Sequence, residues 1–337
     1  MVSMTFATSL FAGLALGEED NEIADWTLAL YIDSDNDLDI WAQEDVDQML
    51  SVGSTENVDI VVLWDTETGP ARAYHVLKGD LSELDDCELN GVETNMGDPE
   101  TLREFVSYAS SSFESEKLML ALWDHGDDSL GVCFDYHTGT DTPIDYLTHQ
   151  EVVSALSESE VDVLLFAACI LAMAEVAYEY YASGVAIDYI VASEGYDPMP
   201  GFPWDTILTE ITARPDMTAL ELATTLVDEH VDYYSVKHRG EDGPHEEGGE
   251  QYEDEPGTAW WFMSYEHVTF SVMDVSEMGE VMTDVEELAS ALILEMDEYA
   301  EVVTRARGLS ILPWSQNGWE RTVDFPTLVE TIGDAWP

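Results

Sequence analysis

Two short apolar runs, each ending abruptly beside a reactive side chain, constrain this chain most strongly. The first run (residues 118–123) is followed at once by Asp124 and His125, and the second (residues 161–166) leads through two alanines to Cys169. Apolar runs of this length in a chain that alternates strand and helix patterns are typical of buried parallel strands. Because open α/β sheets place their sites at the carboxyl ends of strands, the sequence predicts a site containing this histidine and this cysteine.

The spacing of the two residues fits an activated sulfur nucleophile. His125 and Cys169 are 44 positions apart, which leaves room for a loop and one crossover helix between neighbouring strands. Cys169 is the candidate nucleophile, and His125 is the candidate base that takes the thiol proton and later protonates the leaving amine. The N–H groups of Gly126 and Cys169 are the candidate oxyanion hole, since glycine lets the backbone approach developing charge closely. A helix predicted over residues 171–182 would start beside Cys169 and lower its thiol pKa.

This pattern resembles the clostripain-like family, within the caspase-like group of cysteine peptidases. The flanking segments carry the same resemblance in the expected order: residues 26–39 (WTLALYIDSDNDLD), 95–105 (NMGDPETLREF), 193–204 (SEGYDPMPGFPW) and 308–313 (GLSILP). The resemblance implies an α/β fold, a caspase-like three-layer sandwich in which helices flank a mainly parallel sheet of about six strands. It also implies a cysteine endopeptidase that acts through a thioester on Cys169, with a Cys–His dyad. We expect no required cofactor, although Ca²⁺ is possible.

The residues that would set substrate specificity depart from the family pattern. The family has Asp two places before the cysteine, where it helps to hold a basic P1 side chain, and this chain has Ala167 there. Asp197 lies in the matching later segment and is the candidate for a remaining charge, with Glu194 second; both can equally be solvated acids. The family is often self-cleaved after a basic residue between His and Cys, but residues 126–168 contain no Lys or Arg. Self-processing of that kind is therefore excluded here, and a P1 preference for Arg or Lys stays open.

We expect one peptidase domain over residues 21–337. Its catalytic core spans about 24–210, and a C-terminal portion over about 211–337 contributes a last strand at 308–312. Residues 1–20 contain an apolar run like that of a secretory signal, but no Lys or Arg precedes it, so a disordered or packed tail is the alternative. The run is too short to span a membrane. We favour a secreted, extracellular or cell-surface monomer over a cytoplasmic one.

The charge of the chain excludes several classes of partner. Ten Lys and Arg stand against 72 Asp and Glu, for a formal net charge of −62. Nucleic acids and anionic membranes would be repelled by such a protein, so neither is expected as a partner. The 10% aromatic content argues against disorder. Halophilic adaptation fits better, because the Debye length falls to about 3 Å in molar salt and surface carboxylates then hardly repel one another.

The remaining cysteines and histidines predict neither a disulfide scaffold nor a zinc site. Three cysteines do not make a disulfide scaffold. Cys87 and Cys133 can pair in an exported protein, leaving Cys169 free, or all three can be thiols. The other histidines show no zinc spacing, and His230 is expected at the surface with its neighbours in sequence.

An acidic turn after the first predicted strand offers an alternative function. Five acids fall on positions 1, 3, 5, 7 and 12 of a calcium loop: Asp33, Asp35, Asp37, Asp39 and Glu44. Leu38 occupies the position where that loop requires glycine, and the family resemblance already explains an acidic turn here. A calcium-dependent binding module, with Ca²⁺ as its ligand, is therefore a lesser alternative.

A second alternative is an exported binding protein that keeps the peptidase fold without activity. Ala167 favours this interpretation, whereas the presence of His125, Cys169 and Gly126 opposes it. The main prediction remains a cysteine endopeptidase whose partners are protein or peptide substrates.

Overall fold

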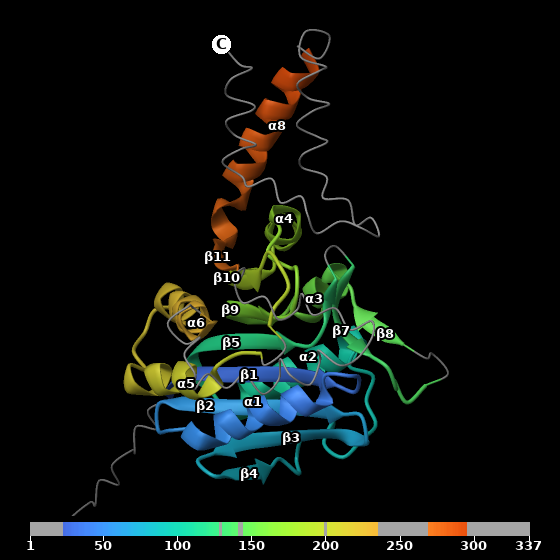
Figure 1. Cartoon of the computed structure of the whole chain (residues 1–337), viewed down its shortest axis with the longest axis vertical. Coiled ribbons are helices and arrows are strands. Elements are labelled where there is room, and N and C mark those ends of the chain that lie inside the picture. The colour runs from blue at the N-terminus through green and yellow to red at the C-terminus, as the bar shows by residue number, and fades with distance from the viewer. Residues whose placement is uncertain (1–22, 128–129, 141–143, 199–200, 235–268, 295–337) are drawn as a thin grey trace, which may run out of the picture.

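A computed structural model describes residues 23–127, 130–140, 144–198, 201–234 and 269–294. These residues form three layers, in which helices cover both faces of one large sheet (Figure 1). The strands of that sheet are β1 (Ala24–Ser34), β2 (Val58–Thr66), β3 (Gly69–Leu77), β4 (Asp80–Glu83), β5 (Ser115–Trp123), β9 (Glu160–Ala167), β10 (Ala186–Ser193) and β11 (Phe270–Asp274). Their order across the sheet is β11-β10-β9-β5-β1-β2-β3-β4.

The sheet is mainly parallel, as the sequence predicts. The five central strands β10, β9, β5, β1 and β2 run parallel, and β11, β3 and β4 pair antiparallel at the two edges. Both apolar runs of the sequence lie in adjacent central strands, β5 and β9. The fold class is confirmed, and the described sheet has eight strands rather than about six because antiparallel strands extend both edges.

Two groups of helices bury the two faces of the sheet. On one face lie α1 (Asp39–Val52), α5 (Trp204–Ala213) and α6 (Ala219–Tyr234); on the other lie α2 (Pro99–Ser112), α3 (His149–Ala155) and α4 (Ala174–Ser183) (Figure 1). Capping residues that can be identified in the sequence mark the starts of several of these helices. The Asp98 side chain caps α2 by accepting the N–H of Glu100, and Thr218 and Glu221 exchange hydrogen bonds at the start of α6.

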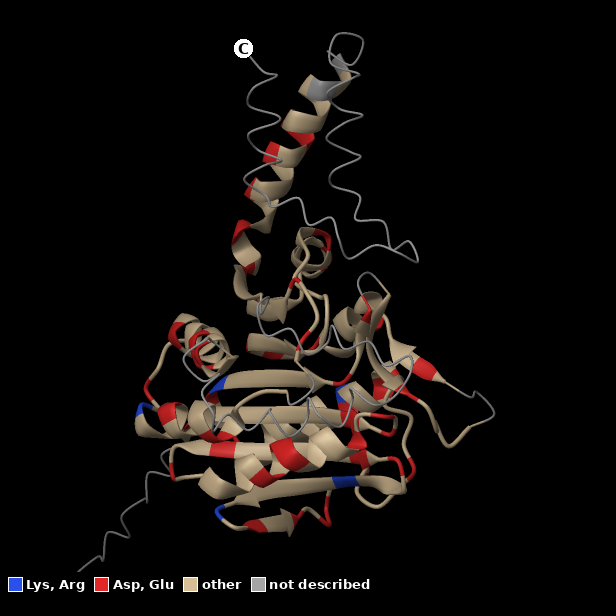
Figure 2. Cartoon of the chain, in the orientation of Figure 1, with Lys and Arg blue, Asp and Glu red and all other residues tan. Residues whose placement is uncertain are grey.

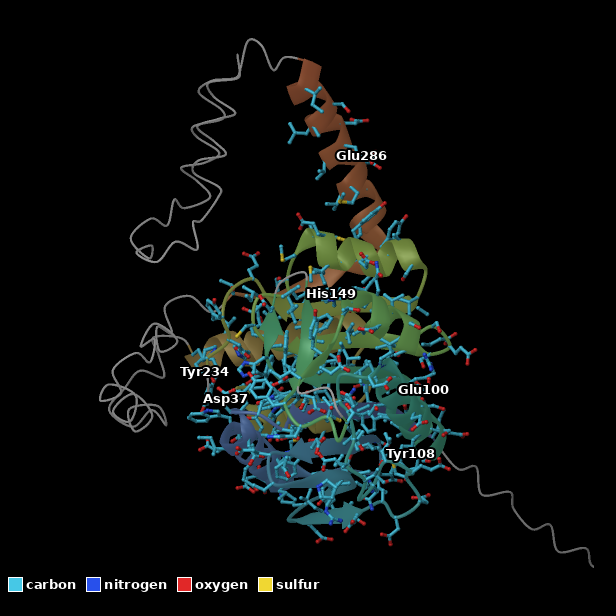
Figure 3. The ribbon with its side chains drawn as sticks, turned by 90° about the vertical axis from the view of Figure 1, so that its right-hand side faces the viewer. Asp37, Glu100, Tyr108, His149, Tyr234 and Glu286 are labelled. Carbon is cyan, nitrogen blue, oxygen red and sulfur yellow. The ribbon has the colours of Figure 1, made fainter. Side chains whose placement is uncertain are left out.

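Smaller elements surround this core. A three-stranded sheet of β6 (Gly126–Asp127), β7 (Gly131–Asp135) and β8 (Asp145–Leu147) follows directly after β5. At the other end, a short 3₁₀ turn, η4 (Val275–Glu277), leads into α8 (Met278–Leu294), which projects away from the sheet with Glu286 on it (Figure 3). The predicted tail at 1–20 and the predicted strand at 308–312 lie outside the described residues.

Acidic residues are present in every layer of the described fold, and Lys and Arg occur at few positions (Figure 2). No helix among the described residues is both long enough and apolar enough to cross a membrane.

Some of the acidic residues are buried near the carboxyl ends of β1 and β2. Asp33, Asp65 and Asp135 have no exposed surface, and one carboxyl oxygen each of Asp33 and Asp65 lacks a hydrogen-bond partner. Burial, followed by the charge of Asp135 and other nearby acids, raises the pKa of Asp65 to about 9.

This shift makes stability depend on pH in a definite direction. The folded pKa of Asp65 lies above its unfolded value of about 4, so its stabilising contribution is complete below that pH and is lost as pH rises towards 9. In that window the group lowers the free energy of unfolding by up to about 1.4 kcal/mol per pH unit. Asp65→Asn should make the fall in unfolding free energy between about pH 5 and pH 8 shallower, as measured by denaturant titration in concentrated salt. Equal slopes in the two proteins would contradict the assignment.

Candidate active site

Loops from four adjacent strands meet at the carboxyl edge of the sheet. The strands β10, β9, β5 and β1 are neighbours and run in the same direction, so their following loops emerge side by side. Trp123 at the end of β5 is in register with Ile32 of β1 and with Ala167 of β9. The structure therefore places His125 and Cys169 just past the ends of two neighbouring strands, where the sequence predicts them.

Cys169 lies on a sharp bend immediately after β9. The next residue, Ile170, has a φ of 51°, in the left-handed region that β-branched residues rarely adopt. Its N–H donates to the carbonyl of Gly195, and the N–H of Leu171 donates to the carbonyl of Ser193, at 2.8 and 2.9 Å. These bonds to the loop after β10 hold the strained bend in place. Backbone strain of this kind is found where a side chain must be held in an exact functional position.

The prediction that Cys169 lies at a helix N-terminus is wrong. α4 begins at Ala174, five residues further along the chain, because the bend occupies the intervening residues. Burial and the negative charges of Asp197 and Asp124 raise the pKa of Cys169 to about 12, although the N–H of Asp197 donates to Sγ at 3.3 Å and opposes the shift. The thiol therefore keeps its proton in the resting protein, and its activation requires a base.

His125 contacts a carboxylate that the sequence did not assign to it. Its Nε2 lies 3.0 Å from Oδ1 of Asp37, a residue in the turn after β1. Burial alone would lower the pKa of His125, but the hydrogen bond to Asp37 and the charges of Asp124 and Asp37 outweigh it and raise that pKa. The same hydrogen bond lowers the pKa of Asp37. Among the described residues no hydrogen bond joins His125 to Cys169.

Gly126 is required by packing as well as by chemistry. A Cβ atom at this position would lie 2.4 Å from the carbonyl oxygen of Cys169 and 2.8 Å from Cδ1 of Leu171. Contacts this short with backbone cannot be relieved by a side-chain rotation. The His loop can therefore cross the Cys loop closely only because residue 126 has no side chain.

The candidate specificity residues differ in their surroundings. Ala167 is buried in the apolar core, and Glu194 is exposed. The carboxylate of Asp197 pairs with Nε2 of His230 at 2.9 Å, and the Asp197 side chain is only 10% exposed. His230 on α6 was expected at the surface, but it is fully buried, with its ring centroid 4.6 Å from that of Phe202. Little in the sequence indicates this burial, because aromatic side chains that surround His230 come from segments far away along the chain.

The acids of the predicted calcium loop face different protein partners. Asp35 pairs with Nδ1 of His137 at 2.5 Å, Asp37 pairs with His125, and Asp39 accepts a hydrogen bond from Ser34. Within the described ranges, no group of three or more His, Cys, Asp or Glu side chains is arranged to hold a metal ion. The three cysteines are all free thiols.

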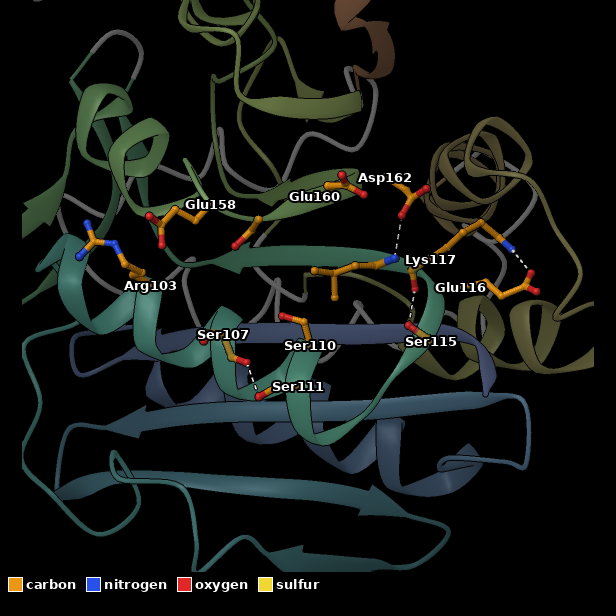
Figure 4. A pocket seen from close by; sticks show the side chains of 12 residues that line it. Arg103, Ser107, Ser110, Ser111, Ser115, Glu116, Lys117, Glu158, Glu160 and Asp162 are labelled. Carbon is orange, nitrogen blue, oxygen red and sulfur yellow. Dashed lines mark hydrogen bonds and ion pairs between the residues drawn. The ribbon is translucent and has the colours of Figure 1, made fainter. Parts of the chain in front are cut away.

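A polar groove lies away from this edge, beside the amino-terminal ends of β5 and β9 (Figure 4). Serines of α2 and the charged side chains of Arg103, Lys117, Glu158 and Asp162 line it. Because parallel strands separate their two ends by their full length, this groove is not part of the Cys169 site.

A sheet that carries a cysteine and a histidine past the ends of two neighbouring parallel strands has the layout of a caspase-like cysteine peptidase. The comparison of sequences gives the family directly. The profile of the clostripain family matches residues 30–326, and this chain belongs to that family. Clostripain from Hathewaya histolytica is 28% identical over 221 residues, which cover 56% of this chain and 42% of that protein. The match thus spans less than half the length of that relative.

Solved structures share the fold. A secreted C11 cysteine protease from Bacteroides thetaiotaomicron, in complex with an irreversible peptide inhibitor, aligns with a TM-score of 0.55 at 20% identity, over 76% of this chain and 67% of that chain. An inactive zymogen C11 protease from Parabacteroides distasonis aligns with the same TM-score and identity, over 77% and 64%. At these identities the likeness concerns the architecture of the sheet and its helices.

Proposed function

We propose that this protein is a cysteine endopeptidase that uses Cys169 as nucleophile and His125 as general acid and base. The observation that carries the proposal is the position of the two residues past the ends of β9 and β5, in a chain of the clostripain family. Because the Cys169 thiol has a raised pKa, His125 acts as a true base and removes the proton as the sulfur attacks.

The proposed reaction has two halves, formation of the thioester and its hydrolysis. Sγ of Cys169 bonds to the peptide carbonyl carbon while the imidazole of His125 takes the thiol proton. The C–N bond breaks, the amine leaves with that proton, and a thioester remains on Cys169. Water then adds its oxygen to the thioester carbon while His125 takes one of its protons. The C–S bond breaks, the acid is released, and His125 returns the proton to the sulfur, which restores the thiol. The N–H groups of Gly126 and Cys169 are proposed to bind the oxyanion in both halves.

We propose an uncharged P1 side chain for the substrate. The P1 side chain is attached next to the attacked carbonyl, so it must lie close to Sγ, and the N–H of Asp197 already contacts that sulfur. The carboxylate of Asp197 is paired with His230, and residue 167 is alanine. A basic P1 side chain would have to compete with His230 for this carboxylate, whereas an uncharged one would not.

The proposed setting is a saline, extracellular one. The net charge of −62 supports adaptation to high salt. One relative of similar fold is described as secreted, which supports export of this protein as well. Protein or peptide substrates are the proposed partners.

The first test is turnover of a fluorogenic peptide library varied at P1, in about 3 M salt. Wild-type protein should cleave peptides with uncharged P1 residues, and Cys169→Ala should lose this activity while retaining its unfolding midpoint. Cleavage that persists in Cys169→Ala would contradict the assignment of the nucleophile. A folded wild-type protein that cleaves no peptide would instead favour the inactive binding protein.

The second test removes the pairing of the Asp197 carboxylate with His230. His230→Phe keeps an aromatic ring in the pocket but removes the partner of Asp197, so the ratio of kcat/KM for Arg-P1 over Leu-P1 substrates should rise about tenfold. This ratio does not depend on the fraction of folded enzyme, so partial destabilisation cannot imitate it. The double variant His230→Phe, Asp197→Asn should show no rise. An unchanged ratio in the single variant would refute the competition.

A further inference from the structure

We infer that Asp37 is a positioning residue that fixes the ring of His125 for proton transfer with Cys169. This inference rests on the proposed peptidase function, which the sequence assigns to a dyad without a third residue. It begins from the 3.0 Å contact between Oδ1 of Asp37 and Nε2 of His125. An acid in such contact with one ring nitrogen determines which tautomer the neutral imidazole adopts.

The turn that carries Asp37 is hydrogen-bonded to the segment after β5 that carries His125. Nδ2 of Asn36 donates to Oδ1 of Asp124 at 2.7 Å and to the carbonyl of Phe134 at 3.1 Å, and its Oδ1 accepts the N–H of Leu38 at 2.9 Å. Asn36 is only 2% exposed, so these bonds form away from competing water. Asp124 directly precedes His125. One buried amide therefore fixes both partners of the Asp37–His125 pair.

The pair leaves a single nitrogen for chemistry. With the Nε2 proton donated to Asp37, the lone pair of the neutral ring lies on Nδ1, and Nδ1 is the atom left to accept the thiol proton of Cys169. The carboxylate also stabilises the imidazolium that forms when this proton arrives, as the acid of a hydrolase triad does. When the amine leaves, Nδ1 returns the proton and the Nε2 bond to Asp37 is unchanged.

The magnitude of the effect follows from exposure. The Asp37 side chain is 68% exposed and that of His125 is 35% exposed, so solvent and salt screen the charge. Screening weakens the electrostatic attraction between the two side chains, but it changes the geometry of their hydrogen bond far less. We therefore expect loss of the carboxylate to reduce kcat by about tenfold, the lower end of the range seen when a residue that orients a metal-binding side chain is removed.

The test combines kinetics with a spectroscopic signature that needs no activity. Asp37→Ala should lower kcat about tenfold with KM unchanged, and Asp37→Glu should recover much of the loss. Glu44→Gln is the matched control, because it removes one charge from exposed α1 near the same turn without a contact to His125. All variants should unfold at the same midpoint, since Asp37 is exposed.

Nitrogen-15 spectra of histidine-labelled protein, assigned with His125→Gln, report which ring nitrogen carries the proton. In spectra taken at a pH above the raised pKa of His125, where the ring is neutral, wild type should show the Nε2–H tautomer and Asp37→Ala should show a mixture. An unchanged tautomer, or a kcat of Asp37→Ala within about twofold of Glu44→Gln, would overturn the inference. If wild type cleaves no peptide, the peptidase proposal fails separately, and the tautomer still decides whether Asp37 holds the ring.

Discussion

The parallel register of β1, β5, β9 and β10 is the constraint on which the site depends. Each strand is buried on both faces, and successive side chains enter opposite halves of the core. In β1, Leu28, Leu30 and Ile32 pack under α1, α5 and α6, whereas Ala29 and Tyr31 pack on the opposite side. A slip of one residue would exchange every side chain between the faces and move the strand end by about 3.3 Å. Packing of the core therefore sets the distance between His125 and Cys169.

A buried acid secures the strand end beneath this site. Oδ2 of Asp45 on α1 accepts hydrogen bonds from the indole N–H groups of Trp123 and Trp204, at 2.7 and 3.1 Å. Trp123 is the last residue of β5, and Trp204 begins α5. Burial raises the pKa of Asp45 well above its usual value, so it holds the two rings as a hydrogen-bonded group within the core. One side chain thereby ties α1, β5 and α5 together two residues before His125.

The acidic surroundings determine which kind of thiol chemistry is available. Many cysteine nucleophiles are thiolates because a helix N-terminus or a cation stabilises the anion. Here carboxylates surround the pair instead: the charges of Asp197 and Asp124 oppose a thiolate on Cys169, and those of Asp37 and Asp124 favour a proton on His125. Proton transfer and sulfur attack are therefore proposed to occur together, which makes the orientation of the imidazole ring more important than in a preformed ion pair.

The sequence alone predicts the mainly parallel sheet, the two apolar strands and the two residues that follow them, because apolar runs and helix caps such as Asp98 before Pro99 are local signals. It predicts less where contacts join distant segments. Asp37 meets His125 across 88 residues, and Asp197 meets His230 across 33. The helix predicted to begin at residue 171 begins later for the same reason. The N–H groups of Leu171 and Ala172, which would lie in its first turn, donate instead to the carbonyl of Ser193. Tertiary hydrogen bonds there override helix propensity.

Mass spectrometry of the full chain treated with a peptidyl acyloxymethyl ketone, in about 3 M salt, tests most directly whether Cys169 attacks a bound peptide with the help of His125. We expect a single adduct on Cys169 in the wild type, and much slower adduct formation in His125→Ala. No adduct on folded wild-type protein, or an adduct only on Cys87 or Cys133, would contradict the claim.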